Sequence, residues 1–209
     1  MPSYVKKKLI EYEHNKPKRP QHCPYSPNTI QYGKANQDPL PEDTSNLLDK
    51  DEKKFVQQVI GSFLFYARAI DMTILLALNA IAGAQAAPTN NTLKRVHQFL
   101  DYMATNPNAI VRFRASDMVL NVHSDASYLS APKARSRAGG YFFLGSLPKH
   151  GQPIHLNGAI HVNCTVLKLV AASAAEAELG ALFTMPNKPK SSDLYCKKWG
   201  THSPQHQST

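Results

Sequence analysis

Two carboxylates stand where side chains often carry out chemistry. Asp125 closes an apolar stretch whose residues alternate with period two, and Glu178 lies in a later segment of helical character, residues 174–184. A strand end holds a carboxylate rigidly, and the small neighbours Ala126 and Ser127 leave room beside Asp125. Carboxylates that converge from a strand and a helix can share divalent metal ions, which activate water to hydrolyse a phosphodiester. Such oxygen ligands favour magnesium, with manganese as its usual substitute.

Both acids also have an ordinary structural interpretation. An aspartate at a strand end is commonly a turn residue, and a helical glutamate is commonly a solvated surface acid. Ser173 and Glu176 match a capping box, so we expect Glu176 to cap the helix start. Glu178 lies about 200° around the helix from Glu176 and cannot share that role. Spacing alone leaves Asp125 and Glu178 open between a metal site and plain surface positions.

The charge balance indicates an anionic partner. The 209 residues include 24 Lys and Arg against 15 Asp and Glu, a formal net charge of +9. Nucleic acid is the usual partner of such a chain, and simple solubility is the alternative. Three separated cysteines, Cys23, Cys164 and Cys196, predict a reducing compartment, hence an intracellular protein of cytoplasm or nucleus. No apolar run reaches about eighteen residues, so no membrane span is expected; the oligomeric state is left open.

Helices are predicted in the first half of the chain. A short amphipathic helix over 3–13 places Val5, Leu9 and Ile10 on one side. Residues 14–49 are rich in proline and read as a connector without a core, either a solvated linker or, through its basic start, an arm that contacts phosphate. Three further helices follow, built on the apolar periodicity of Phe55–Leu64, the apolar run Met72–Ala84, and the face of Val96, Phe99, Leu100 and Met103.

From residue 109 the apolar period changes to two, which is typical of strands. Strands are expected over 109–114, 118–125 and 140–145, and strand-like pieces over 154–162 and 165–170 lie around the hairpin signal Asn157-Gly158. In the second strand, Asn121, His123 and Asp125 share one face and Leu120 and Val122 the other. No long periodic segment occurs after Phe183, so a disordered tail is expected over 186–209.

Three motifs, in this order and spacing, resemble the ribonuclease H domain at the end of copia-type LTR retrotransposon polyproteins. They are His123–Tyr128, Ala134–Leu144 and Val170–Leu179. Upstream, Ile60–Arg68 and Leu93–Leu100 resemble the helical region that links the polymerase to ribonuclease H, and Met1–Val5 resembles the segment beyond the polymerase palm. The likeness covers about residues 1–183.

The resemblance implies an α+β fold, in which a helical connection region leads into a partial ribonuclease H-like mixed sheet with a helix. We expect a post-polymerase segment and connector at 1–49, the helical region at 50–108, the first part of the ribonuclease H-like domain at 109–185, and a tail outside the family at 186–209.

The resemblance also implies an activity. In the family, the strand aspartate and the helix glutamate bind Mg²⁺ or Mn²⁺ and cut the RNA strand of an RNA–DNA hybrid, and these positions match Asp125 and Glu178. The polymerase palm is absent from this sequence. The only acid after Glu178 is Asp193, which no apolar strand precedes, so the family's later acids have no clear counterpart. We expect a fragment with little or no nuclease activity; the alternatives are a non-catalytic basic nucleic-acid-binding protein and a non-functional element remnant.

Two weaker features complete the candidate sites. Lys133, Arg135 and Arg137 are expected in the loop after Asp125, either contacting phosphates beside the hybrid groove or simply solvated. In the tail, Cys196, His202 and His206 have a spacing that echoes half of a zinc site.

Overall fold

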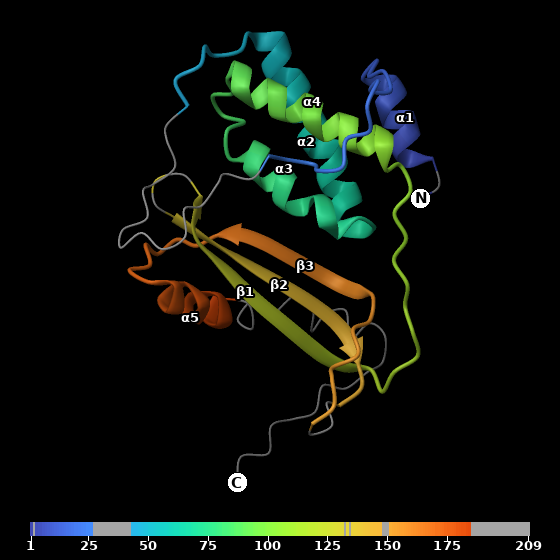
Figure 1. Cartoon of the computed structure of the whole chain (residues 1–209), viewed down its shortest axis with the longest axis vertical. Helices are drawn as coiled ribbons and strands as arrows, with labels where there is room; N and C mark the ends of the chain where they lie inside the picture. The colour runs from blue at the N-terminus through green and yellow to red at the C-terminus, as the bar shows by residue number, and fades with distance from the viewer. Residues whose placement is uncertain (2, 27–42, 132, 134, 148–150, 185–209) are drawn as a thin grey trace. The chain divides into compact units, whose positions relative to one another are not determined.

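The computed structural model of the chain describes residues 1, 3–26, 43–131, 133, 135–147 and 151–184. The chain divides into two compact units, residues 1–110 and residues 111–209. The described part of the first unit is helical, whereas that of the second holds a sheet and one helix (Figure 1). The fold class is therefore α+β, as the sequence predicts. None of the described helices is both long and apolar enough to cross a membrane.

Two capping boxes fix where the long helices of the first unit begin. The Asp49 carboxylate accepts a hydrogen bond from the Glu52 backbone N–H at the start of α2, and Thr89 does the same for Thr92 at the start of α4. The elements of this unit are α1 (Tyr4–Glu11), α2 (Lys50–Ala69), the 3-10 turn η1 (Met72–Ile74), α3 (Leu75–Ala82) and α4 (Asn90–Thr105).

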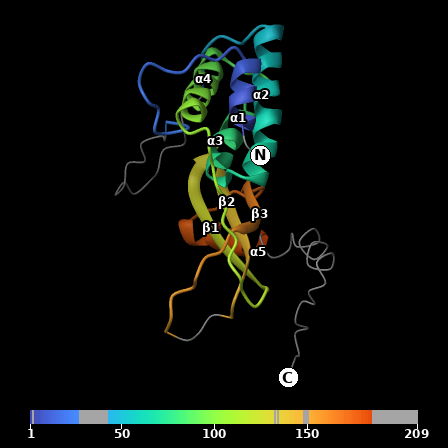
Figure 2. The same cartoon turned by 90° about the vertical axis from the view of Figure 1, so that its right-hand side faces the viewer.

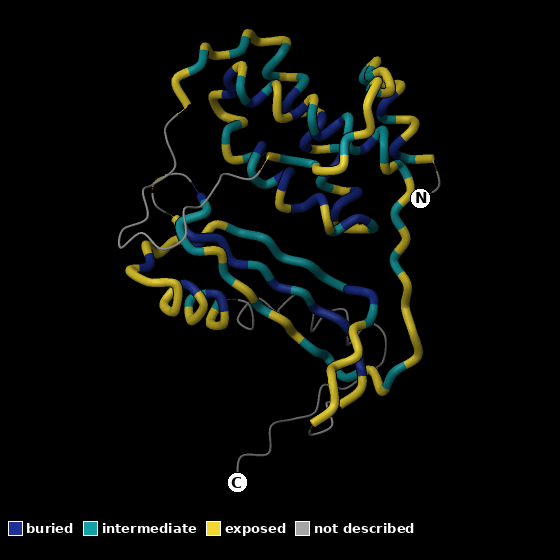
Figure 3. Tube along the Cα trace, viewed as in Figure 1, coloured by how far each residue is buried: buried dark blue, intermediate teal, exposed yellow. Residues whose placement is uncertain are grey.

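The helical core lies where the periodicity places it. Phe63 on α2 and Phe99 on α4 are both fully buried, and their rings meet edge to face with centroids 5.2 Å apart. The predicted apolar face of α4 is buried throughout, and Val56, Val59 and Ile60 of α2 are buried beside Phe63. Figure 3 shows buried stretches alternating with exposed ones along the helices of this unit.

Helix α1 packs onto α2 through two tyrosines. Tyr4 donates from its hydroxyl to the Ser62 carbonyl oxygen at 3.0 Å, and Tyr12 donates to the Ser62 hydroxyl at 2.7 Å. Figure 2 shows α1 between α2 and α4. Val5 and Leu9 are buried as predicted, but Ile10 is 78% exposed. Val5 and Leu9 lie four positions apart on one helix face, whereas Ile10, one position after Leu9, points to the side of that face.

Residues 14–26 are hydrogen-bonded to α4. His14 Nε2 lies 2.8 Å from Asp101 Oδ1, and the Gln21 backbone N–H donates to Thr105 Oγ1 at 3.0 Å, so the segment follows α4. Further along, Ser26 and the carbonyl of Cys23 bond Gln98. None of residues 14–26 is buried, so the stretch adds nothing to the core; its hydrogen bonds to polar side chains of α4 are a feature for which apolar periodicity gives no signal.

The second unit contains a three-stranded sheet in the order β1-β2-β3, with antiparallel neighbours. Its elements are β1 (Val119–Ala131), β2 (Arg135–Gly145), β3 (Ala159–Val166) and α5 (Ala174–Thr184). The predicted helix at 174–184 and the predicted faces of the strand before Asp125 are confirmed. The sheet was expected to be mixed, yet every pairing among the described strands is antiparallel.

Two predictions around the sheet were wrong. Residues 109–114 form no strand; the Arg114 backbone instead bonds the side chain of Asn157, whose amide takes the place of a strand partner. Asn157-Gly158 is not a hairpin turn, because the Asn157 side chain is engaged and the chain runs straight on into β3. An Asn-Gly pair favours a tight turn, but here the glycine allows the backbone around Arg112 to approach closely. A Cβ on Gly158 would lie only 2.7 Å from the Arg112 carbonyl oxygen.

Helix α5 packs against β1 and β2. The core beneath it consists largely of small residues, with Ala177 and Ala181 of the helix set against Ala138 and Phe142 of β2. Ala126 and Tyr128 of β1 border the same cluster. This packing settles which sheet face α5 covers, and so which side chains lie on the other face.

Candidate active site on the sheet

Asp125 lies within β1, directly opposite Gly139 of β2. Its side chain is exposed, and it shares one face of the sheet with His123, whose cross-strand partner is Tyr141. A glycine opposite a carboxylate leaves that side of the pair open. The result is an open hollow of about 390 Å³, here called the Asp125 hollow, lined by His123, Ser124, Asp125, Gly139, Gly140, Tyr141, Val162 and Asn163.

Aromatic contacts hold one wall of the Asp125 hollow. The His123 ring meets the buried Phe143 ring edge to face at 5.4 Å, and the Tyr141 ring lies 5.6 Å from Phe143. The Tyr141 hydroxyl donates to the Asn157 carbonyl oxygen at 2.7 Å, which fixes the outer end of that side chain. The hollow is therefore lined by the Asp125 carboxylate, the His123 imidazole and the oriented Tyr141 phenol, all on the paired strands β1 and β2.

Glu178 and Glu176 have different surroundings on α5. The Glu176 backbone N–H donates to Ser173 Oγ at 3.2 Å, and the Glu176 carboxylate accepts from the Ala172 backbone N–H at 2.7 Å. The predicted capping role of Glu176 is confirmed, although its side chain reaches one residue before the cap. Glu178 follows the buried Ala177 and is itself exposed.

The structure does not bring Asp125 and Glu178 together. Ala126 borders the core beneath α5, and side chains of neighbouring strand residues point to opposite faces, so Asp125 faces away from α5. Glu178 belongs to the helix that covers the other face. Within the described residues, no three His, Cys, Asp or Glu side chains form a group that could hold a metal ion. The described residues thus do not fit a shared two-metal site, and magnesium at these acids stays a prediction.

The basic residues expected in one loop are divided between a turn and a strand. Strand β1 continues through a bulge to Ala131, so Arg135 and Arg137 fall inside β2 and only residues 132–134 connect the two strands. Lys133 and Arg135 are exposed, whereas Arg137 is 9% exposed. The loop prediction was wrong because the bulge lets β1 extend beyond the end of its regular alternation.

Comparisons with protein-family models, with curated proteins and with solved structures found no match. The family resemblance therefore rests on the sequence motifs alone.

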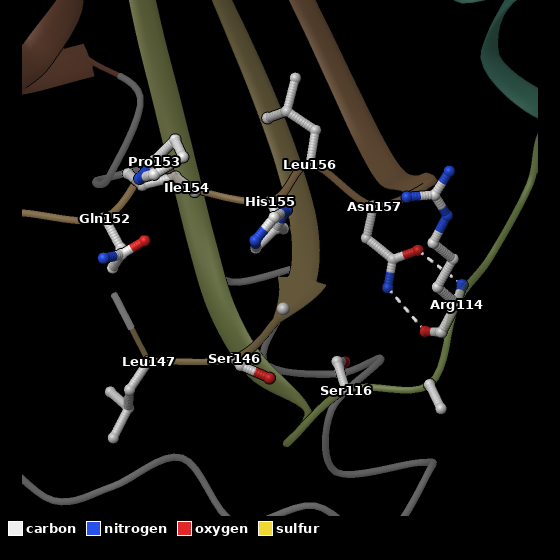
Figure 4. Close-up of a pocket in the computed structure, with 12 residues that line it drawn as sticks. Arg114, Ser116, Ser146, Leu147, Gln152, Pro153, Ile154, His155, Leu156 and Asn157 are labelled. Atoms are coloured by element: carbon white, nitrogen blue, oxygen red, sulfur yellow. Dashed lines mark hydrogen bonds between the residues drawn. The ribbon is translucent and has the colours of Figure 1, made fainter. Parts of the chain in front are cut away.

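A larger hollow lies where β2 ends, beside the chain that precedes β1 (Figure 4). It has a volume of about 690 Å³ and is lined by residues 114–116, 145–147 and 152–157. Asn157 bonds both the N–H and the carbonyl of Arg114, at 2.7 and 2.8 Å, and its amide also donates to the Leu144 carbonyl at 2.7 Å. These bonds connect the chain before β1 to the end of β2. Asn157 therefore has a structural role in this hollow.

Sequence reasoning missed the residues that shape the Asp125 hollow. Gly139 and Tyr141 lie in the motif Ala134–Leu144, to which no site role was assigned, and their positions opposite Asp125 and His123 follow from the strand register. The candidate ligands Asp193, Cys196, His202 and His206, the expected tail 186–209 and residues 27–42 of the expected connector lie outside the described residues.

Proposed function

We propose that the chain is a fragment of the ribonuclease H part of a copia-type retroelement polyprotein, and that on its own it cleaves RNA–DNA hybrids weakly or not at all. The ordered motifs and the α+β fold support the kinship. One observation supports the low activity: Asp125 faces away from the helix that carries Glu178. Hydrolysis with two metal ions needs carboxylates that converge from several elements.

The residues of the Asp125 hollow are better suited to binding a ligand than to catalysing hydrolysis of a phosphodiester. Asp125 is an exposed oxygen ligand with open space opposite it at Gly139, so any divalent ion there would have few protein ligands and would be held loosely. His123 adds a ring nitrogen on the same face, whereas the Tyr141 hydroxyl already donates to the Asn157 carbonyl oxygen and so shapes the wall of the hollow.

The activity is tested on a labelled RNA–DNA hybrid with Mg²⁺ or Mn²⁺, beside the variants Asp125→Asn and Glu178→Gln. We expect the unchanged chain to cleave no faster than Asp125→Asn. Robust cleavage that both variants abolish would contradict the proposed low activity. The kinship has its own test, in which the later acid-bearing segment of a copia-type ribonuclease H is fused after residue 184. The kinship predicts restored cleavage, which requires that the added segment also bring Glu178 to the same site as Asp125; a folded fusion without cleavage would contradict the kinship.

A second candidate function is nucleic-acid binding without catalysis. The net charge of +9 and the exposed Lys133 and Arg135 favour it. Phosphate contacts release counterions, so affinity for hybrid or duplex should fall steeply between about 50 and 200 mM salt and be independent of magnesium. Binding that does not respond to salt would argue against this function.

A further inference from the structure

The Arg137 side chain is nearly buried, and its guanidinium has no protein partner. Arg137 is 9% exposed, and in the part of the chain that the structure describes it forms no ion pair and donates no hydrogen bond. Every fully buried polar side-chain atom of the described residues has a hydrogen-bond partner. The Arg137 nitrogens have none, so they keep contact with solvent while the aliphatic stem is buried. Nearly buried charges are normally paired, which makes this guanidinium a candidate anion-binding group.

Arg137 lies on the sheet face that α5 does not cover. Its neighbour Ala138 belongs to the core beneath α5, and adjacent strand residues point to opposite faces. Arg135, two positions earlier in β2, shares the face of Arg137 and is exposed. Ser127 of β1 lies directly opposite Arg137 and is also exposed. This end of the face therefore offers two guanidinium groups and a hydroxyl.

The same face continues into the Asp125 hollow. Gly139 is the next residue of β2 on this face and lies opposite Asp125, and Tyr141 is the one after it and lies opposite His123. A strand advances about 3.3 Å per residue, so the positions of Arg137 and Tyr141 are about 13 Å apart along β2. The face therefore presents a basic end, then an open position beside a carboxylate, and then aromatic rings.

A ribonucleotide unit carries complementary groups in the same order over a comparable length. A guanidinium binds phosphate oxygens with two parallel hydrogen bonds. A carboxylate only accepts hydrogen bonds, and the sugar hydroxyls can donate them, as in the recognition of ribose by an acidic residue in dinucleotide-binding folds. A base can stack on the exposed His123 ring.

The space and the charges of this face favour such a ligand over a simple anion. The Asp125 hollow has a volume of about 390 Å³, within the range of small-molecule sites, and Gly139 has no side chain to fill it. A bare anion would use only the basic end and would be repelled by the nearby Asp125 carboxylate. A ligand that also donates hydroxyl hydrogens turns that carboxylate into a partner.

We propose that this face of the sheet binds a ribonucleotide unit. Arg137 and Arg135 bind its phosphate, with Ser127 Oγ as a further donor. Asp125 accepts hydrogen bonds from the sugar hydroxyls, and the base stacks on the His123 ring. A free nucleotide and one nucleotide of an RNA strand offer the same groups. The site needs neither a metal ion nor cleavage, and in its RNA form it rests on the nucleic-acid binding proposed above.

The test titrates the full chain with ligands at about 50 mM salt, without divalent ions, and measures Kd by isothermal titration calorimetry. The ligands are adenosine monophosphate, its deoxyribose analogue, adenosine, inorganic phosphate and a short single-stranded oligoadenylate. We expect saturable binding of the monophosphate and at least about tenfold weaker binding of adenosine and of inorganic phosphate, because each keeps only part of the contacts. An oligoadenylate that binds more than about tenfold tighter than the monophosphate identifies an RNA strand as the source, and equal affinities identify the free nucleotide.

Variants locate the site. Arg137→Lys keeps the charge but removes the paired hydrogen bonds, and it should weaken monophosphate binding about tenfold. Arg112→Lys, at an exposed arginine in the chain before β1, is the matched control and should leave Kd unchanged. Asp125→Ala should abolish the preference for ribose over deoxyribose, which we expect to be about threefold in the unchanged chain. Circular dichroism checks each fold, and Arg135→Gln, expected to weaken binding about threefold, replaces any Arg137→Lys chain that unfolds.

Several results would overturn the proposal. They are no saturable binding of the monophosphate by the folded chain, equal affinity for inorganic phosphate, equal losses from Arg137→Lys and Arg112→Lys, and a ribose preference that survives in Asp125→Ala. Salt-dependent binding of hybrid or duplex that Arg137→Lys does not change, without binding of the monophosphate, would overturn this site and leave the broader nucleic-acid-binding function standing.

Discussion

Thr89 donates a hydrogen bond from its hydroxyl to the Asp43 carboxylate at 2.6 Å, across 46 positions of the chain. Thr89 is also the N-cap of α4, so one side chain joins the helix start to the segment before α2. The Asp43 carboxylate accepts two further hydrogen bonds from Ser45, at 2.6 Å from its hydroxyl and 3.0 Å from its backbone N–H. These donors stabilise the charged form of the carboxylate.

The acid stability of the helical unit should depend on Asp43. Hydrogen bonds from Ser45 and then Thr89 lower the Asp43 pKa well below its ordinary value of about 4. Because the folded pKa is the lower one, the stabilisation is present above about pH 4 and is lost as the pH falls through the folded value. Asp43→Asn should lower the urea midpoint at pH 7 and flatten its acid dependence. Glu13→Gln serves as the control, and an identical acid profile for both variants would contradict the prediction.

His97 should give the helical unit a second pH dependence. Its ring lies 6.1 Å from both the His14 and Phe55 rings, and partial burial, followed by the His14 charge, lowers its pKa, while Asp101 opposes this shift. A lowered folded pKa means that the contribution is complete above about pH 6.5 and is lost as the pH falls through the folded value. In urea melts between pH 5 and 8, His97→Gln should reduce this loss. The exposed His22 provides the control, and equal changes of slope in His22→Gln and His97→Gln would contradict the prediction.

The contact of Phe63 with Phe99 should dominate the helical core. Both rings are fully buried, so Phe99→Ala removes apolar burial and leaves a cavity, at a cost of about 3–5 kcal/mol. Phe65→Ala, at a ring 58% exposed, should cost less than about 1 kcal/mol. Urea unfolding followed by circular dichroism measures both. Similar losses from the two variants would mean that the core does not centre on this pair.

Two glycines of the sheet unit should respond in opposite ways to alanine. A Cβ on Gly139 meets nothing closer than the Asp125 carbonyl oxygen at 3.9 Å, so Gly139→Ala should raise stability by about 0.4–1 kcal/mol. A Cβ on Gly158 would lie 2.7 Å from the Arg112 carbonyl oxygen, and Gly158→Ala should cost about 1–3 kcal/mol. Thermal melts compare them, and a gain from Gly158→Ala would show that the chain before β1 is not held there.

Asn157 should anchor the chain that precedes β1. Asn157→Ala leaves the Arg114 backbone groups and the Leu144 carbonyl without the amide that bonds them, at a cost of about 0.5–1.5 kcal/mol because the Arg114 groups can turn to water. Hydrogen exchange at the Arg114 amide should accelerate strongly, while Gln152→Ala, at an exposed residue of the same hollow, should leave it unchanged. Unaltered exchange in Asn157→Ala would contradict the anchoring role.

Periodicity predicted the elements whose apolar residues face one core. The buried faces of α2 and α4 follow from spacings of three and four residues, and α5 follows from its cap at Ser173. The alternation through Asp125 correctly placed His123 and Asp125 on one face. These features depend on local sequence, which is why they could be read directly.

The failures came from contacts between distant residues. The local sequence of residues 14–26 does not indicate that His14 contacts Asp101. Likewise, the residues around Asn157 do not indicate its hydrogen bonds to Arg114. The side of the sheet that α5 covers decides whether Asp125 and Glu178 meet, and it depends on how Ala177 packs beside Ala138. Spacing along the chain identified both acids but carried no information about that packing.

The side chains that join α1 and its following segment to later helices have a consequence for the order of folding. Tyr4 reaches Ser62, and His14 reaches Asp101, across 58 and 87 positions respectively. Helical domains usually fold fast because their contacts are local, whereas a distant contact requires a long loop to close first. The helical unit should therefore fold more slowly than its helix content suggests, with α2 and α4 associating before the N-terminal residues dock.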